Sequence, residues 1–515
     1  MSTFFRKNLL PLATLIVIII FFLAAAQGMN SQDFVITLLR GLSVGAVTFL
    51  VASGFSLIFG LLDVLNLAHG TLFMIGAYIG WTVFVRPDTF VDLLTPLALA
   101  LSGFTLRDVY PLLSDRIRLS LSMKRILPWA LILVSALLFI LVLPRYPIAG
   151  WNLDNYAQSP VTYSYMADQG TRLPPPTVAF DQISPALAIG GLLLVSLLGS
   201  FGLSLFDQSA RRSPQLTWRS YASFVILLFI GLITFIFNDA LTNFLLGLNA
   251  NWLFFIAVIV ATLSGAGLGA LMEMTLIRPL YSRPIYQLML TIGLSAIGVQ
   301  IVQAVWGRPE FIMPKPTLFN GSGASCPATN FSSWWQGNCS TILLLGGRVR
   351  VYNEILIPII GVLVLIAVWI LLQRTRLGMI IRAGVQDREM VEALGINVRR
   401  AFTIVFALGV GLATLGGALA APSMGLSNAM GESLLLDALI ALAIGGLTSY
   451  PGAALGSLLV GLIQQFMIQY GQIGISIPFT SLVLKPTPPI VPASTVLLMV
   501  IILLILPNGL LGKKE

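Results

Sequence analysis

The chain has 515 residues, of which 57% are hydrophobic and only 10% are charged. Soluble globular proteins carry about 25% charged residues, so this composition excludes an ordinary soluble protein. Apolar runs of about 18 or more residues recur along the chain, and each can cross a bilayer as a helix. A membrane β-barrel is excluded, because its strands alternate apolar and polar residues. We therefore predict an all-α polytopic membrane protein. Its excess of Lys and Arg, 29 against 20 acidic residues, is typical of cytoplasmic loops and does not indicate nucleic-acid binding.

The first membrane segment begins almost at the N-terminus. Residues 1–27 imitate a secretory signal, but we expect an uncleaved anchor helix with an outer loop that ends at residue 33. Fourteen segments are predicted; the fourth and twelfth are short enough to be re-entrant, so we expect about 12–14 spans. The segments lie near 9–27, 34–60, 66–85, 93–106, 126–143, 184–206, 220–237, 252–277, 286–306, 355–372, 402–421, 434–448, 452–470 and 489–507.

The charge distribution predicts the orientation. If the N-terminus is cytoplasmic and every segment spans, most Lys and Arg residues fall in the shorter loops on the inner side. This is the asymmetry that the positive-inside rule requires, and the inverted topology fails it. Both termini are therefore predicted to be cytoplasmic.

The stretch "LLDVLNLAHGTLFMIGAYIG", Leu61–Gly80, holds the only histidine of the chain. The topology places its start at a cytoplasmic turn, so we expect Asp63 to meet water. Asn66 is a predicted N-cap for the next helix, and His69 lies in the first turn of that helix. Polar side chains there can satisfy a helix end that is costly in lipid. We assign a structural role to Asn66 and His69; a proton relay or a substrate ligand stays the alternative.

Small residues recur at four-residue spacing in three segments, which allows helix backbones to approach closely in lipid. The pairs are Gly41 with Gly45, Gly265 with Gly269, and Gly452 with Gly456. We expect packing within the chain, with a dimer contact as the alternative.

A long outer loop, roughly 307–354, holds both cysteines, Cys326 and Cys339. An oxidising exterior favours a disulfide between them. The spacing alone leaves two free thiols as the alternative.

The inner loop "RTRLGMIIRAGVQDREMVEALGINVRR", 374–400, contains a predicted short helix over Gln386–Leu394. Asp387 can cap the start of this helix, and Glu389 lies in its first turn, where the helix dipole favours an anion. Gly395 follows the end, where a left-handed residue belongs.

Met390, Val391, Ala393 and Leu394 would form an apolar patch on this helix, too small to bury in lipid. A short capped helix presented to the cytoplasm suits docking into a groove on a partner. A solvated connector is the equally weighted alternative.

This loop resembles the coupling loop of the branched-chain amino acid permease family of bacterial ABC importers. Five further blocks resemble that family in the same order: 41–81, 272–300 with its "EMTLIRP", the two blocks "RAFTIVFALGVGLATLGGALAAP" and "ALIALAIGGLTSYPGAALGSLLVGLI", and "LPNGLLG" at 506–512. Against the shorter members, residues 86–251 form an extra stretch. We therefore predict an N-terminal anchor (1–33), a first part of the permease core (34–85), a membrane insertion (86–251) and a second part of the core (252–515) with its coupling loop at 373–401.

The resemblance implies a transport subunit with no catalytic residues, set in the lipid bilayer of the cell (inner) membrane. It implies three kinds of partner: a second homologous permease, two cytoplasmic ABC ATPases and an extracytoplasmic substrate-binding protein. The sequence has no G-x-x-x-x-G-K-[ST] P-loop, so we expect ATP to be bound by the partners and no cofactor by this chain. Branched-chain amino acids are the default substrate, with urea or short amides as the alternative.

Acidic residues at membrane depth are functional candidates by default. Glu273 lies near the inner end of a helix, five residues before Arg278, and an interfacial ion pair is its simplest role. Glu432 and Asp437 border the twelfth segment on the outer side. They would meet a substrate ammonium group or a basic patch on the binding protein; helix capping is the alternative.

Two rival functions fit the sequence less well. An ion-coupled secondary transporter needs coupling acids at the bilayer midplane, which is nearly free of charge here. A membrane-embedded enzyme needs a nucleophile with a base or a metal cluster, and one histidine with two exterior cysteines supplies neither, so we expect no metal site.

Overall fold

The fold is that of an all-α polytopic membrane protein, as predicted. A computed structural model describes residues 29–106, 109–110, 121–143, 183–206, 218–281, 283–306, 310–323, 325–386, 388–476 and 483–512. Within these ranges the named strands form two short antiparallel hairpins, β1 (Thr341–Leu344) with β2 (Gly347–Arg350) and β3 (Ile475–Ser476) with β4 (Val483–Leu484). The chain divides into two compact units, and each is described by itself.

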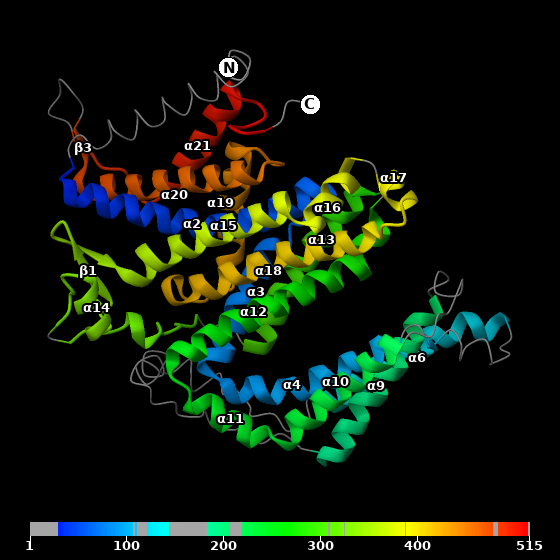
Figure 1. Ribbon diagram of the computed structural model, residues 1–515. Helices are drawn as coiled ribbons and strands as arrows, with labels where there is room; N and C mark the ends of the chain where they lie inside the picture. The colour runs from blue at the N-terminus through cyan, green and yellow to red at the C-terminus, as the bar shows by residue number, and fades with distance from the viewer. Residues whose placement is uncertain are drawn as a thin grey trace. The chain divides into compact units, whose positions relative to one another are not determined.

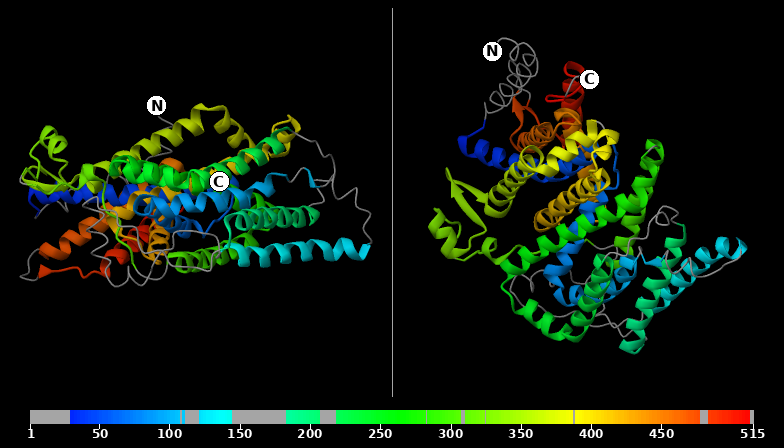
Figure 2. Two further views of the ribbon diagram at one scale, coloured as in Figure 1. Left: turned by 90° about the horizontal axis from the view of Figure 1, so that it is seen from below. Right: turned by 45° about the vertical axis from the view of Figure 1, so that its right-hand side comes forward.

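The first unit contains the described residues up to 81 and those from 250 onward. Its long elements are α2 (Ser31–Leu62), the start of α3 (His69–Val85), α12 (Ala250–Met272), α13 (Pro284–Trp306), α15 (Ile357–Arg374), α18 (Val398–Met424), α19 (Met430–Gly445), α20 (Tyr450–Ile473) and α21 (Ile490–Ile505). Helices α2 and α20 run side by side in Figures 1 and 2. The spans over α2 and α18 are the most completely buried, so they form the centre of this unit.

Glycine pairs explain why these helices lie so close together. A Cβ at Gly45 would lie 2.9 Å from the carbonyl oxygen of Ser457 on α20, and one at Gly269 would lie 2.7 Å from Val410 on α18. Gly456 likewise faces the backbone of Ala441 on α19. The expectation that the paired glycines pack within the chain is confirmed, since each pair faces a neighbouring helix of the same unit.

The second unit covers residues 82–159 and 171–249, of which the described parts are mostly helical. Its elements are α4 (Pro87–Ser102), η1 (Gly103–Leu106), α6 (Leu121–Val142), α9 (Pro185–Phe206), α10 (Trp218–Ile236) and α11 (Asn238–Gly247). Hydroxyl groups join its helices: the Thr95 and Thr234 hydroxyl oxygens are 2.9 Å apart, and Ser196 donates to the Ala100 carbonyl at 2.6 Å. Such bonds hold helices together where water is absent.

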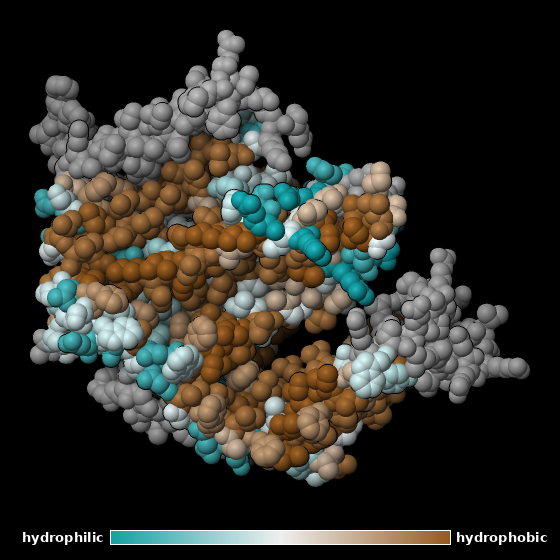
Figure 3. All heavy atoms as spheres, viewed as in Figure 1, coloured by the Kyte–Doolittle hydropathy of each residue, from teal (hydrophilic) through white to brown (hydrophobic). Residues whose placement is uncertain are grey.

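Eight helices in the described ranges are long and apolar enough to cross a membrane, or up to nine if α10 and α11, bent by 74°, make one span. The apolar helices His69–Val85, Ile126–Val142 and Ile490–Ile505 are shorter. The first of the fourteen predicted segments lies outside the described residues, and each of the others falls on a helix. The predicted 12–14 spans refer to the whole chain, whereas these counts refer to the described ranges alone. Three of the predicted segments fall on the shorter apolar helices. In Figure 3 the visible flanks of the helices are mostly apolar, and hydrophilic residues gather near their ends.

Candidate functional site

A cavity of about 320 Å³ lies inside the first unit. It opens where α2, α15, α18, α19 and α20 meet β2 and the short π-helix η7 (Val351–Leu356). Its lining residues are Arg40, Ser43, Val44, Val47, Arg350, Asn353, Glu354, Ile357, Ala420, Ser423, Met424, Leu434, Asp437, Gln464 and Gln465. The lining thus combines charged, amide and apolar side chains.

Glu354 carries the negative charge on the α2 and η7 part of the lining. Its side chain is only 2% exposed, and Arg40 Nε lies 3.2 Å from Oε1. Arg350 contributes twice: its backbone N–H donates to Oε2 at 2.8 Å, and its Nε lies 3.6 Å from Oε1. A buried carboxylate needs such partners. Two guanidinium groups against one carboxylate leave this part of the cavity with a net positive charge.

On the α19 and α20 side of the cavity, the negative charge comes from Asp437 of α19. Gln464 of α20 donates to its Oδ1 at 3.0 Å, and among the described residues Asp437 forms no ion pair with a basic side chain. Of the two acids predicted near this segment, the structure therefore brings only Asp437 to the cavity. Glu432 is exposed in the first turn of α19, where an acid is favoured by the helix dipole.

The predicted coupling loop holds two helices where one was expected. Helix α16 spans Arg376–Gln386 and α17 spans Arg388–Ala393, so the predicted start at Gln386 is wrong: that residue ends the preceding helix. No helix was predicted for the part of the loop before Gln386, where the structure has α16. Asp387 lies outside the described residues, as does the side chain of Glu389, so the predicted cap and first-turn charge stay predictions.

Gly395 ends α17 in the predicted left-handed conformation, with φ of 78°. Its N–H donates to the Glu392 carbonyl at 3.0 Å, and the Ile396 N–H donates to the Val391 carbonyl at 3.3 Å. These two bonds form a Schellman motif, which terminates the helix sharply. Asn397 then caps α18 by accepting from the Arg400 N–H at 3.1 Å.

The four residues of the predicted apolar patch do not share one surface. Val391 is only 5% exposed and packs against Val398 and Phe402 of α18. Met390, Ala393 and Leu394 are exposed, with Leu394 at 72%. The patch prediction was wrong for Val391, because α17 uses this residue to hold itself against the chain. Ala393 and Leu394 remain available to a partner.

Glu273 has the ion-pair geometry expected from its spacing to Arg278. Its side chain is fully buried, and Arg278 binds both carboxylate oxygens, at 3.0 and 2.7 Å. Tyr281 donates to Oε1 at 2.8 Å, and Thr403 of α18 donates to Oε2 at 2.7 Å. Tyr281 also packs on Phe402, next to Val391. The network therefore connects the end of α12 with the start of α18 beside α17.

Asn66 and His69 lie at the turn between α2 and α3, and Asp63 at its start is exposed, as expected. Helix α3 begins at His69, and the Asn66 side chain accepts from the Ala68 N–H at 3.2 Å. Asn66 thus caps the turn ahead of α3 and not the helix itself. His69 is fully buried against Phe55, with the Val51 backbone nearby, and neither ring nitrogen makes a well-formed hydrogen bond to any described residue.

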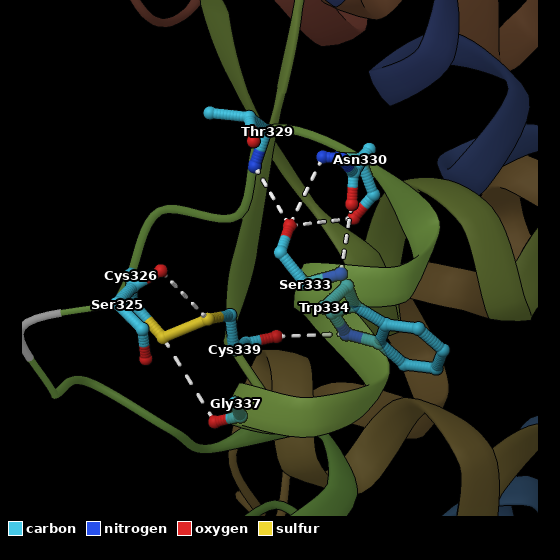
Figure 4. Close-up of a disulfide and its surroundings, with 8 residues drawn as sticks. All are labelled: Ser325, Cys326, Thr329, Asn330, Ser333, Trp334, Gly337 and Cys339. Atoms are coloured by element: carbon cyan, nitrogen blue, oxygen red, sulfur yellow. Dashed lines mark hydrogen bonds between the residues drawn. A yellow bond between two sulfur atoms is a disulfide. The ribbon is translucent and has the colours of Figure 1, made fainter.

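A disulfide joins Cys326 to Cys339 (Figure 4). Beside it, α14 (Phe331–Gly337) begins with a capping box between Asn330 and Ser333, and the Trp334 indole N–H donates to the Cys339 carbonyl at 2.9 Å. Cys339 is followed directly by the β1–β2 hairpin, whose last residue, Arg350, lines the cavity. The disulfide-bonded segment is thus followed in the chain by the hairpin that carries Arg350 of the cavity lining.

Comparison with known proteins identifies the family. The model of the family described as "Branched-chain amino acid transport system / permease component" matches residues 37–162 and 184–506. The chain belongs to this permease family. It is a multi-pass membrane transport protein, and the match includes both the cavity and the α16–α17 segment.

Curated relatives agree with the permease assignment. The chain is 26% identical over 274 residues to the high-affinity branched-chain amino acid transport system permease protein LivH of Escherichia coli K12 and of Salmonella typhimurium, covering 53% of this chain and 79% of each relative. It is 30% identical over 177 residues to BraD of Pseudomonas aeruginosa, covering 33% of this chain and 51% of that relative. No solved structure matches the chain.

Proposed function

We propose that the chain is the transmembrane permease subunit of an ATP-driven importer for branched-chain or related amino acids. The observation that carries this proposal is the family match, which covers most of the chain and includes relatives named as high-affinity branched-chain amino acid permeases. Urea or short amides are the alternative substrates. Residues 86–251 stay a predicted insertion, and they nearly coincide with the second compact unit.

The α16–α17 segment is the proposed docking site for an ATPase. Met390, Ala393 and Leu394 project from a short helix that Gly395 ends and that Val391 anchors to α18. An anchored helix with an exposed apolar tip suits a groove on a partner. Two ATPases, a second permease and an extracytoplasmic binding protein would complete the importer in the inner membrane. ATP would be bound and hydrolysed by the ATPases alone.

Reconstitution of the complete complex in proteoliposomes tests the proposal. Leucine uptake is expected only with ATP on the ATPase side and binding protein on the opposite side. Uptake by this chain alone, driven by an ion gradient, would establish a secondary transporter instead. Leucine and urea binding to the isolated binding protein decides between the two substrate classes.

A further inference from the structure

We propose that the cavity beside Arg40 and Asp437 is itself a selectivity site, which binds the carboxylate and the ammonium group of an apolar α-amino acid. The inference rests on the proposed import function and deepens it, because it assigns discrimination to the permease as well as to the binding protein. Such a site would bind amino acids in preference to urea and short amides.

The carboxylate would bind on the positive part of the lining. Arg40 and Arg350 both reach the single carboxylate of Glu354 there. The Arg40 side chain is 35% exposed and the Arg350 side chain 51%, so donors remain for a second anion. Guanidinium groups bind carboxylates through parallel hydrogen bonds, and Glu354 holds both arginines in place for this.

The ammonium group would bind at Asp437. This carboxylate accepts one hydrogen bond from Gln464 and forms no ion pair among the described residues. Its charge is therefore compensated only by an amide. A cationic ligand group would supply the missing counter-charge.

The remaining lining suits the side chain of the ligand. Val44, Val47, Ile357, Met424 and Leu434 provide apolar surface in the same cavity. Its volume of about 320 Å³ is at the small end of the range of about 300–1,000 Å³ for ligand pockets. A site with separated charges and an apolar wall discriminates against uncharged urea, because urea would compensate neither the excess positive charge of Arg40 and Arg350 nor the carboxylate of Asp437.

A thiol placed in the cavity can report occupancy. Cys326 and Cys339 are joined to each other, so Ser423→Cys adds a reactive thiol at an exposed lining position. The purified permease–ATPase complex is labelled with a small methanethiosulfonate reagent, without binding protein. Leucine should slow labelling severalfold. Urea, 4-methylpentanoate, which lacks the ammonium group, and isopentylamine, which lacks the carboxylate, should not.

Substitutions test whether Asp437 and Arg40 bind the charged groups of the ligand. Asp437→Asn should abolish protection by leucine, and Arg40→Gln should do the same. Asp239→Asn, the same chemical change at an exposed acid of α11 outside the cavity, should keep protection. Met424→Cys serves as a second reporter if Ser423→Cys lowers expression.

Equal protection by leucine and urea, or full protection in Asp437→Asn, would overturn the selectivity site. The importer function is judged separately, by ATP-dependent uptake in the complete wild-type system. Normal uptake together with absent protection would reject this inference alone.

Discussion

Buried polar side chains in this permease differ sharply in how they are satisfied. Glu273 is fully buried, yet Arg278, Tyr281 and Thr403 all donate to its carboxylate. His69 is equally buried, and within the described part of the chain neither of its ring nitrogens has a well-formed hydrogen bond. An unsatisfied buried donor or acceptor costs about 1–3 kcal/mol. The Glu273 network is therefore expected to stabilise the fold, whereas His69 contributes mainly by filling space.

Thr403→Val tests the Glu273 network at nearly constant volume. The loss of the hydroxyl removes one donor to a buried carboxylate and one acceptor for Arg278, so stability should fall by about 1–3 kcal/mol. Thr275→Val is the matched control, because Thr275 is exposed and its hydroxyl donates to the Leu271 carbonyl one turn earlier in the helix. Thermal unfolding in detergent compares the two variants. Equal midpoints would show that the network adds nothing.

His69→Gln tests the role of the only histidine. Its ring packs edge-on against Phe55, and a Cβ at Gly54 would approach its Nε2 to 2.8 Å, so the site fits the imidazole tightly. Replacement should lower the unfolding midpoint and leave ATP-driven leucine uptake in place. Uptake measured on the stable, assembled complex decides the matter. If uptake is lost while assembly is normal, His69 belongs to the transport pathway.

At the scale of elements, different residues of the α16–α17 segment hold it against α18 and face outward. Val391 is buried against α18, the Schellman motif at Gly395 ends the helix, and Leu394 projects outward. Force applied to the tip of α17 would pass through Val391 into Val398 and Phe402. These residues lie next to Tyr281 and so to the Glu273 network.

The paired variants Val391→Ser and Leu394→Ser separate these two roles. Val391→Ser removes a buried apolar side chain and should destabilise the protein by a few kcal/mol, whereas Leu394→Ser should change stability by less than about 0.5 kcal/mol. Leu394→Ser should nevertheless weaken ATPase association and lower leucine uptake. Both are measured on the purified complex. Normal coupling in Leu394→Ser would place the ATPase contact elsewhere.

At the scale of the whole molecule, features that depend on local sequence could be predicted, whereas contacts between residues far apart in the chain could not. Each predicted segment within the described residues falls on a helix, and Gly395 has the predicted backbone conformation, because apolar length and cap chemistry act locally. The cavity was not predictable in this way. Arg40 and Glu354 are 314 positions apart, and nothing in the pattern of either segment indicates that they meet. Only Asp437 was anticipated, as an isolated acid near membrane depth.

Helix α2 indicates which parts of the first unit lie on the same side of the membrane. Near its start, Gln32 donates to the Gly346 carbonyl in the β1–β2 hairpin at 3.3 Å. At its other end, Leu62 packs with Val391 and Tyr281. Figure 1 shows the hairpin and α17 at opposite ends of α2. A helix of 32 residues is about 48 Å long, more than the hydrocarbon core, so we expect the hairpin and α17 to lie on opposite sides of the membrane.

The positive-inside rule then assigns the sides. The α16–α17 segment carries several arginines, so it should be cytoplasmic, and the hairpin with its disulfide should be outside. Single cysteines introduced into a background without Cys326 and Cys339 test this in intact cells. A thiol at Gly323 should react with a membrane-impermeant maleimide, whereas one at Leu394 should react only after permeabilisation. The reverse pattern would invert the topology, place the Arg40–Asp437 cavity on the cytoplasmic half, and exclude α17 as the site of ATPase docking.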